Sequence, residues 1–287
     1  MRNDHSALLK DCIISPALPG LPRDGPARRT WRFGPLLFWL AAFFVVVGPV
    51  LAESQTNPQQ GSKLVGTGAV GPAEQGWSVA LSADGNTAIV GGVADNRAAG
   101  AAWVFTRSGD VWTQQGSKLV GTGAVGSAGQ AVSVGLSDDG NTAIVGGPWD
   151  SSRTGAVWIH NRSGGVWTQQ GSKMVGTGAV GHAGQGISVA LSDDGNTAVV
   201  GGVGDNSGSG AAWAHTRSGT NWTQQGSKLV GTGAVGHAGQ GHSVALSADG
   251  NTAIVGGLTD NKVTGAAWVH TRSGGVWTRA PVQYLGY

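Results

Sequence analysis

Residues 75–92 read QGWSVALSADGNTAIVGG, and this stretch decides the fold. In residues 78–82 (SVALS), valine and leucine alternate with small residues, which is the two-residue period of a half-buried strand. Asp84-Gly85 is a strong tight-turn dipeptide, and residues 87–92 (TAIVGG) form a second β-rich run. The stretch therefore predicts an antiparallel hairpin.

The same stretch occurs four times along the chain. Each copy begins 55 residues after the one before, with no insertion between copies. Within the first copy, residues 101–107 and 111–120 predict two more strands, joined by a turn at Ser108-Gly109. No part of the copy has the 3.6-residue apolar period of a long helix. The predicted repeats span residues 59–113, 114–168, 169–223 and 224–278.

Repeats of four short strands cannot bury both faces of their hairpins alone, so they must stack on their neighbours. A period of 55 residues exceeds the coils of a β-helix and is closer to the blades of a β-propeller. We therefore expect an all-β fold, a β-propeller of four four-stranded blades over residues 59–278. The repeats begin at Gln59 inside one predicted strand and end at Thr278 inside its counterpart, so the two ends could complete one shared blade. The alternative is an incomplete ring that associates with another copy of the chain as a homo-oligomer.

The first 52 residues predict export. A cluster of arginines precedes an uncharged run over residues 33–52, which is the order of the charged and hydrophobic regions of a signal peptide. Small residues at its end suit a cut after Ala52. The alternative is an uncleaved membrane anchor, because about 20 uncharged residues can just span a bilayer. We expect a secreted, periplasmic or cell-surface protein that meets the membrane only through this segment.

Two short segments flank the predicted propeller, a linker over residues 53–58 and a tail over residues 279–287. Cys12 is the one cysteine and precedes the predicted cut, so the mature chain would have no disulfide. Residues 1–52 hold six of the 18 basic residues and three of the 16 acidic ones, which leaves 12 basic and 13 acidic residues beyond them. The chain beyond residue 52 thus has a net charge of about −1, which does not support binding to nucleic acid.

The pattern Q-G-x-S-V-A, which reads QGWSVA at residues 75–80, and the pair Gly91-Gly92 recur in register in every repeat, except that the second repeat has Ala131 for the first glycine and Gly135 for the last alanine. Together they resemble the FG-GAP repeat of integrin-α-like β-propellers, in a bacterial-type variant. The family pattern Phe-Gly-x-Ser-Val-Ala has Phe where this chain has Gln75. The resemblance implies a propeller, usually of seven blades, and a role in adhesion.

In calcium-binding members of that family, the segment between the two motifs contains a D-x-D-x-D-G cage. Here it shrinks to a short turn at residues 82–87 that holds Asp84 and Asn86. Calcium needs six to eight oxygen ligands, which so short a turn cannot supply. We therefore expect no metal and interpret these residues as turn formers that bond nearby backbone amides. The counterparts of Asp84 are Asp139, Asp194 and Asp249.

Two further motifs lack the context that their chemistry needs. Residues 66–71 (GTGAVG) satisfy G-x-G-x-x-G, yet no helix is predicted to open after them, as a dinucleotide site requires. Ser243 resembles a nucleophile elbow, but its counterparts lie inside predicted strands. We expect no catalytic residue and no cofactor. Three histidines share the repeat position of Phe105, where we expect half-exposed strand side chains, the alternative being a ring around a central channel. They are His160, His215 and His270.

The loops after each second predicted strand differ most between repeats, so we expect ligand contacts there. Trp149 stands in one of them beside an acid, which suits stacking on a sugar ring. The candidate residues are Asp95, Trp149, Asp150, Asp205 and Asp260. The expected function is an exported, non-enzymatic binding or adhesion module for a glycan or an extracellular protein. The alternatives are a structural or self-associating envelope repeat protein, such as a truncated longer propeller, and a carbohydrate-active enzyme.

Overall fold

The computed structural model describes residues 59–279 of the 287-residue chain. These residues lie within one compact unit. The predicted signal peptide, its cut after Ala52, the linker over residues 53–58 and nearly all of the predicted tail lie outside the described residues. In the part of the chain that is described, no helix has the length and apolar character needed to cross a bilayer.

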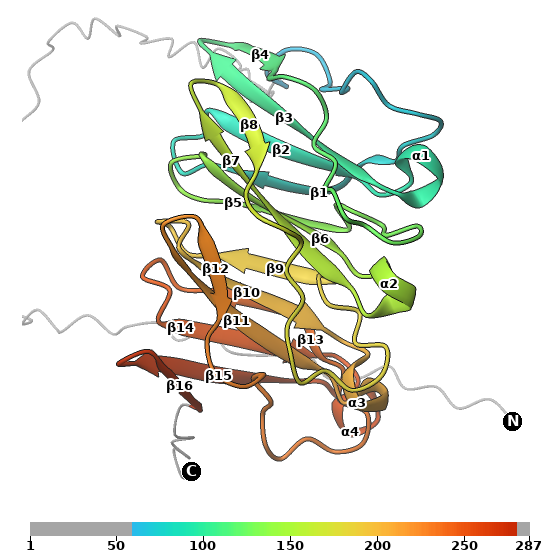
Figure 1. Ribbon diagram of the computed structural model, residues 1–287, viewed down its shortest axis with the longest axis vertical. Coiled ribbons are helices and arrows are strands. Elements are labelled where there is room, and N and C mark those ends of the chain that lie inside the picture. Colours follow the sequence, from blue (N-terminus) through green and yellow to red (C-terminus); the bar gives the residue numbers. More distant parts are fainter. Residues whose placement is uncertain (1–58, 280–287) are drawn as a thin grey trace, which may run out of the picture. The chain divides into compact units, whose positions relative to one another are not determined.

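The described residues form an all-β fold of four antiparallel sheets, each of four strands that neighbour one another in chain order (Figure 1). Sheet 1 contains β1 (Gln75–Leu81), β2 (Thr87–Gly92), β3 (Ala101–Ser108) and β4 (Val111–Gln114). Sheet 2 contains β5 (Ser133–Leu136), β6 (Thr142–Gly147), β7 (Ala156–Ser163) and β8 (Val166–Gln169). Sheet 3 contains β9 (Ser188–Leu191), β10 (Thr197–Gly202), β11 (Ala211–Ser218) and β12 (Asn221–Gln224). Sheet 4 contains β13 (Gln240–Leu246), β14 (Thr252–Gly257), β15 (Ala266–Ser273) and β16 (Val276–Arg279). The predicted all-β class and the four-stranded repeat are confirmed.

The predicted tight turn closes the first hairpin of every sheet. In sheet 1, the Ser82 hydroxyl donates to one carboxylate oxygen of Asp84 at 2.6 Å. The backbone N–H of Asn86 donates to the same oxygen at 2.9 Å. Gly85 adopts a φ of 67°, a left-handed conformation that glycine reaches without steric cost. The interpretation of these residues as turn formers is confirmed.

The predicted fourth strand over residues 111–120 is too long. β4 ends at Gln114, and Gly116 takes a φ of 73°, which turns the chain out of the strand. After the turn, Leu119 pairs with Ala102 of β3, with backbone hydrogen bonds of 2.7 and 3.0 Å in both directions. The segment that leads into each following sheet therefore runs back along the third strand of the sheet before it.

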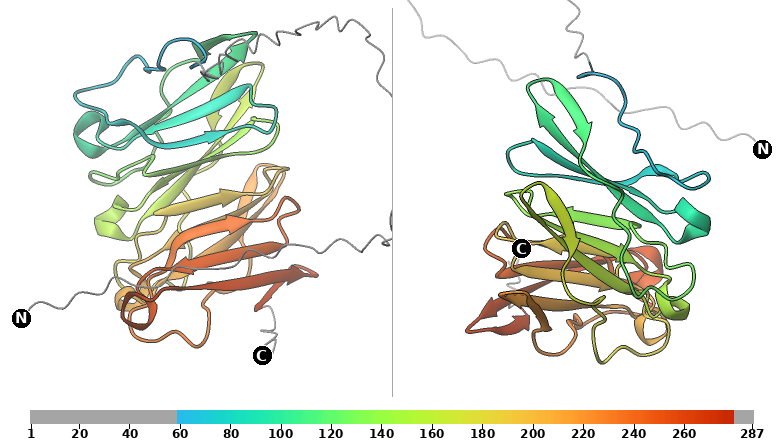
Figure 2. Two further views of the ribbon diagram at one scale, coloured as in Figure 1. Left: turned by 180° about the vertical axis from the view of Figure 1, so that it is seen from behind. Right: turned by 45° about the horizontal axis from the view of Figure 1, so that its top comes forward.

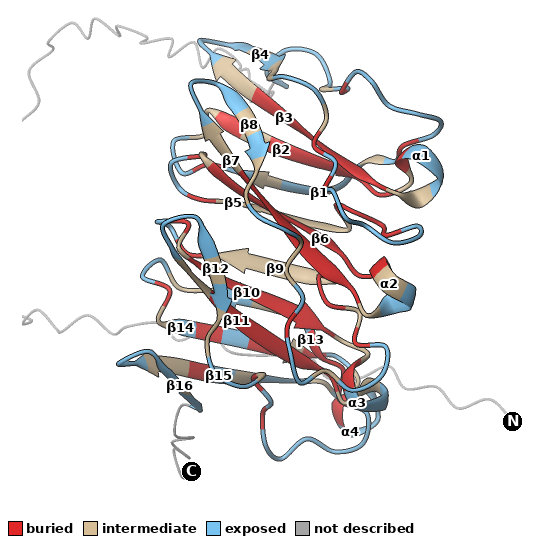
Figure 3. Cartoon of the chain, in the orientation of Figure 1, coloured by how far each residue is buried: buried red, intermediate tan, exposed pale blue. Residues whose placement is uncertain are grey.

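Neighbouring sheets stack face to face, and their first strands β1, β5, β9 and β13 lie side by side in that order (Figures 1 and 2). Between sheets 1 and 2, the buried Ile89 and Val104 pack against Ala143 and Val145. Figure 3 shows that such buried residues are densest in the two inner sheets. Small residues in register let the sheets approach closely, so most of the core lies between repeats.

Sheets 1 and 4 do not join. Both views place them at opposite ends of the stack, and within residues 59–279 no sheet combines strands of the first and last repeats (Figures 1 and 2). The beginning of the described chain instead contacts sheet 1, where the Gln60 amide donates to Asp110 at 2.7 Å and accepts from Trp112 at 3.3 Å. The shared blade expected from Gln59 and Thr278 is therefore not formed by the described residues.

Candidate ligand-binding loops

The four predicted contact loops lie along one edge of the stack (Figures 1 and 2). Each joins the second strand of a sheet to the third and contains one short helical turn. The turns are α1 (Asp95–Ala98), α2 (Asp150–Arg153), α3 (Asp205–Gly208) and α4 (Asp260–Val263). Loops that meet along one edge can present a common surface to a ligand.

The backbone of these turns is left-handed. In α2, three successive residues have positive φ angles, 49° at Ser151, 55° at Ser152 and 70° at Arg153. A left-handed conformation costs roughly 1–2 kcal/mol for each non-glycine residue because Cβ approaches the following carbonyl oxygen. Only α3 places a glycine, Gly208, at the third position. Surrounding contacts must hold the turns in this shape.

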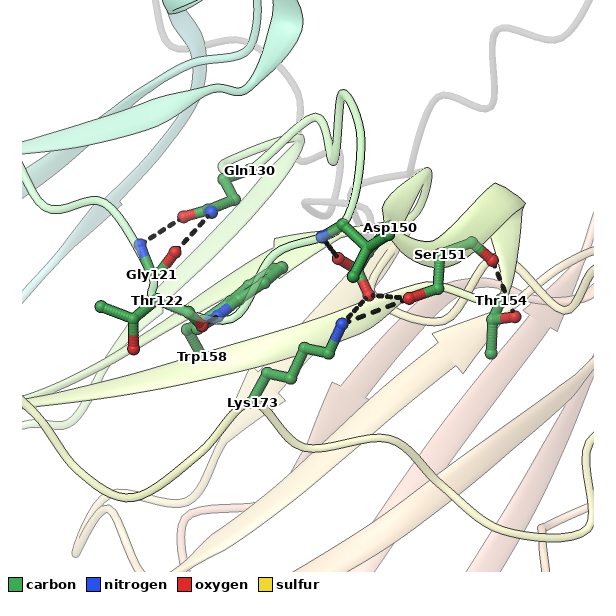
Figure 4. A network of polar contacts seen from close by, with 9 residues as sticks. Gly121, Thr122, Gln130, Asp150, Ser151, Thr154, Trp158 and Lys173 are labelled. Carbon is green, nitrogen blue, oxygen red and sulfur yellow. Dashed lines mark hydrogen bonds and ion pairs between the residues drawn. The ribbon is translucent and has the colours of Figure 1, made fainter.

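The aspartate that opens each turn supplies these contacts (Figure 4). One carboxylate oxygen of Asp150 accepts the backbone N–H of Val125 at 2.7 Å. The other accepts the Ser151 hydroxyl at 2.9 Å and forms an ion pair with Lys173 at 2.5 Å. Lys118 pairs with Asp95, and Lys228 with Asp205, in the same way. These buried carboxylates hold the loop to its neighbours, so a ligand at this edge would meet other side chains. Ligand binding by Asp95, Asp150, Asp205 and Asp260 stays a prediction.

The G-x-G-x-x-G loops are filled by the repeat's own side chains (Figure 4). The first glycine, Gly121, lies so close to the Trp158 indole that a Cβ would overlap it. The Trp158 N–H donates to the Thr122 carbonyl at 2.8 Å, and the Gln130 amide bonds both backbone groups of Gly121, at 2.6 and 3.0 Å. The role of Gln130 was missed, although glutamine at the same position of all four repeats was a visible signal.

Trp149 lines a cavity of about 280 Å³. The ring packs over Gly129, where no Cβ would fit, and its side chain stays 39% exposed. The other repeats carry smaller residues at this position, namely Ala94, Gly204 and Thr259. The cavity lies where sheets 2 and 3 meet and is lined by Pro148, Trp149, Arg153, His182, Gly184, Ile187, Val203 and Gly204.

The histidines at the shared repeat position are buried, on the third strands of their sheets. Burial lowers the pKa of His160 and of His215 to about 4. One ring nitrogen of each has no hydrogen-bond partner among the described residues. The expectation of half-exposed side chains is wrong, because all three residues are at most 4% exposed. The expected central ring is not formed either, because these residues lie on the third strands, whereas the strands that lie side by side from sheet to sheet are the first ones.

The carboxylates of the hairpin turns are strongly hydrogen-bonded. The Ser82 hydroxyl first of all, together with both N–H groups of Asn86, lowers the pKa of Asp84 to about 2. The same bonds lower the pKa of Asp249 to about 2. Within residues 59–279, no group of three or more histidine, cysteine or acidic residues is arranged to hold a metal ion. The expectation that the chain binds no metal stays a prediction.

Comparison with known proteins gives structural likenesses only. No family model matches the chain, and no curated protein matches it. A functionally unknown protein from Desulfotomaculum acetoxidans is 14% identical with a TM-score of 0.47, over 80% of this chain and 61% of its own. A protein from Bacteroides uniformis, described as "a putative 6-phosphogluconolactonase", is 14% identical with a TM-score of 0.48, over 70% of this chain and 52% of its own. The chain thus spans less than two thirds of either structure.

One of these structures corrects an expectation from the sequence. The sequence predicted a non-enzymatic chain, whereas one matched structure is described as "a putative 6-phosphogluconolactonase", an enzyme, so that prediction is withdrawn. That description concerns the matched protein, and at 14% identity it assigns no activity and no catalytic residue to this chain. The resemblance to FG-GAP repeats stays a prediction.

Proposed function

We propose that the four stacked sheets are blades of a β-propeller-type array and that the array binds a glycan at the Trp149 cavity. The observation that carries this proposal is the exposed Trp149, which stands at a position where the other repeats have Ala94, Gly204 and Thr259. Packing and repeat symmetry give no reason for a large aromatic ring at one loop only. A partly exposed indole is a stacking surface for a sugar ring.

The rest of the lining points to an acidic sugar. Arg153 and His182 are exposed and supply hydrogen-bond donors beside the ring, and Ile187 supplies apolar surface. The lining contains no acidic side chain. Arginine favours carboxylate, sulfate and phosphate groups, because its planar fork can donate two hydrogen bonds to one anion. A volume of about 280 Å³ is small for a ligand pocket and suits one terminal sugar rather than a long chain.

The cellular setting of this function rests on the sequence. The FG-GAP-like motif supports a propeller used in adhesion, and the predicted signal peptide supports export. A glycan on a cell surface or in the extracellular matrix is then the partner. A structural role in the cell envelope stays the alternative prediction.

The test is a screen of the full chain against glycans with and without carboxylate or sulfate groups, followed by titration of the best ligand. Trp149→Ala installs the residue of the first repeat, so the fold should tolerate it, and we expect at least a tenfold loss of affinity. Arg153→Ala should weaken binding of acidic glycans more than neutral ones. Trp77→Ala, which removes an exposed tryptophan elsewhere, is the matched control and should bind normally. Equal affinity of Trp149→Ala and the parent chain would refute the proposal.

A further inference from the structure

Each pair of neighbouring sheets is joined by the same set of contacts. Between sheets 1 and 2, the entering segment places Leu119 against Ala102 in a two-way backbone pair, and Lys118 against Asp95 in an ion pair. The Ser78 hydroxyl also donates across the junction, to the carbonyl oxygen of Ala131 at 2.7 Å. The next two junctions repeat all three contacts, through Met174–Val157, Lys173–Asp150 and Ser133–Gly186, and through Leu229–Ala212, Lys228–Asp205 and Ser188–Gly241.

Among the described residues, sheet 1 has the entering segment of this interface but no preceding sheet that it contacts. Lys63 and Leu64 stand at the repeat positions of Lys118 and Leu119. Lys63 is exposed, and within residues 59–279 it takes part in no ion pair. Val79, at 68% exposure, and Leu81, at 57%, present apolar side chains to solvent.

Sheet 4 carries the receiving half. Asp260 is buried and accepts the backbone N–H of Val235 at 2.7 Å, but among the described residues it has no lysine partner. Ala267, at the repeat position of Ala102, pairs with Gly256 of β14 but, among the described residues, lacks the second bridge that Ala102 makes to Leu119. The apolar face is open as well, because Ile254 is 42% exposed and Val269 is 40% exposed. Their counterparts in sheet 1, Ile89 and Val104, are at most 1% exposed.

The two open ends are therefore complementary in charge, strand pairing and apolar surface. We propose that a second copy of this chain docks head to tail, with its sheet 1 on sheet 4 of the first copy. Lys63 of the second copy then pairs with Asp260, and Leu64 of the second copy pairs with Ala267. Ser243 donates to the carbonyl oxygen of Gly76, and the Val79 face covers Ile254 and Val269.

This interface joins two different surfaces, so each copy keeps one open end after the first contact. Such a heterologous contact closes into a ring when the rotation between copies permits, and otherwise it grows into a longer array. A second copy is the occupant that the sequence favours, because the same residue types already form this junction three times within the chain. The inference does not depend on glycan binding.

A cross-linking experiment on the full chain tests the docking. Both partners carry Cys12→Ser, which removes the one native cysteine. One partner also carries Leu64→Cys and the other Ala267→Cys. Residues of a hydrogen-bonded antiparallel pair lie about 5.5 Å apart at Cα, which a disulfide can span. Mild oxidation of the mixture should give a covalent dimer of one copy of each partner.

Two controls test the geometry and the specificity of the disulfide. Ala102→Cys with Leu119→Cys in one chain should form an internal disulfide, which shows that the geometry permits the bond. Leu64→Cys mixed with Val111→Cys, an exposed position on β4, should give no dimer. Absence of a covalent dimer between the Leu64→Cys and Ala267→Cys partners, while the internal disulfide forms, would overturn the proposal. Covalent dimers through Leu64→Cys alone would overturn it too, because they require two equivalent ends to meet.

A charge exchange gives a second readout in the absence of oxidant. Lys63→Asp should weaken self-association at least tenfold in sedimentation experiments, and adding Asp260→Lys should restore it. Ser152→Asp, which adds a charge to an exposed loop of sheet 2, should have no effect. A chain that is monomeric at all concentrations, because its own residues 1–58 or 280–287 cover the ends, would contradict the proposal.

Discussion

The Lys228 ammonium nitrogen lies 2.6 Å from a carboxylate oxygen of Asp205, and this contact ties the segment entering sheet 4 to the loop of sheet 3. The carboxylate is buried, whereas the lysine keeps a fifth of its side chain exposed, at 21%. The same carboxylate accepts the backbone N–H of Val180 at 2.7 Å. One side chain therefore fixes a strained turn, a glycine-rich loop and the junction between two repeats.

We expect Asp205→Asn to lower the free energy of unfolding by about 2 kcal/mol, because the lysine loses its partner at a mostly buried site. Asp260→Asn is the matched control. Among the described residues Asp260 has no lysine partner, so its replacement should cost less than about 1 kcal/mol. Urea denaturation at low protein concentration measures both. Equal losses would show that the ion pair contributes nothing.

Val263→Gly should stabilise the chain by about 1 kcal/mol. Val263 is exposed and has a φ of 72°, a conformation that is costly for a β-branched residue and open to glycine. The third repeat already has Gly208 at this position, with a φ of 92°. Gly208→Val should destabilise by a similar amount. Thermal unfolding of the two variants checks the prediction. The melting temperature should rise for Val263→Gly and fall for Gly208→Val, and shifts of the same sign would contradict it.

Stability should fall as the pH falls from about 6.5 to about 4. In the unfolded chain, histidine titrates near 6.5, whereas burial lowers the pKa of His160 and of His215 to about 4. Between these pH values the unfolded state therefore binds more protons than the folded state. Each buried neutral histidine contributes about 3 kcal/mol to the free energy of unfolding above pH 6.5, and this contribution is lost as the pH falls to about 4. The hydrogen-bonded carboxylates of Asp84 and Asp249 affect stability only at lower pH, because their pKa values are about 2.

Replacing the two histidines by phenylalanine separates their contribution to the pH dependence of stability from that of other titratable groups. Phe105 occupies the position in the first repeat, so His160→Phe with His215→Phe should fold and should flatten the profile between pH 6.5 and 4. Unfolding free energies at a series of pH values give the profile. An unchanged slope in the double variant would assign the pH dependence to other groups.

Gly121→Ala should destabilise the second repeat by at least about 2 kcal/mol, because the new methyl group overlaps the buried Trp158 ring. Gly135→Ala is the matched control. Its methyl group would meet only the Cγ2 methyl group of Ile144, at 3.0 Å, and the other three repeats have alanine there. Circular dichroism during urea denaturation compares the two. Comparable losses would show that the contact with Trp158 is not the cause.

Local pattern and turn chemistry were enough to predict the sheets. The alternation in residues 78–82 and the Asp84-Gly85 turn act within one hairpin, and β2 occupies the predicted residues 87–92. The break after Gln114 was missed because residues 111–120 are equally suited to one strand and to a strand followed by a turn at Gly116. In a chain with so many glycines, the presence of a glycine does not predict which of them takes a left-handed φ.

The arrangement between repeats could not be predicted in the same way. Whether a stack closes depends on the small rotation from one sheet to the next, which residues such as Ala143 and Val145 set through their packing and not through a motif. The burial of Asp95 was missed for a related reason. Its partner Lys118 lies 23 residues further along, in the segment that leads into the next sheet. Trp149 stood out from the sequence because it breaks the repeat.

Hydrogen exchange at two equivalent amides tests most directly whether the repeated interface is open at the ends. The N–H of Ala102 donates to the carbonyl oxygen of Leu119, so it should exchange slowly at every protein concentration. The equivalent N–H of Ala267 should exchange rapidly in dilute protein and become protected as the concentration rises. Protection of Ala267 equal to that of Ala102 in the most dilute sample would contradict the account.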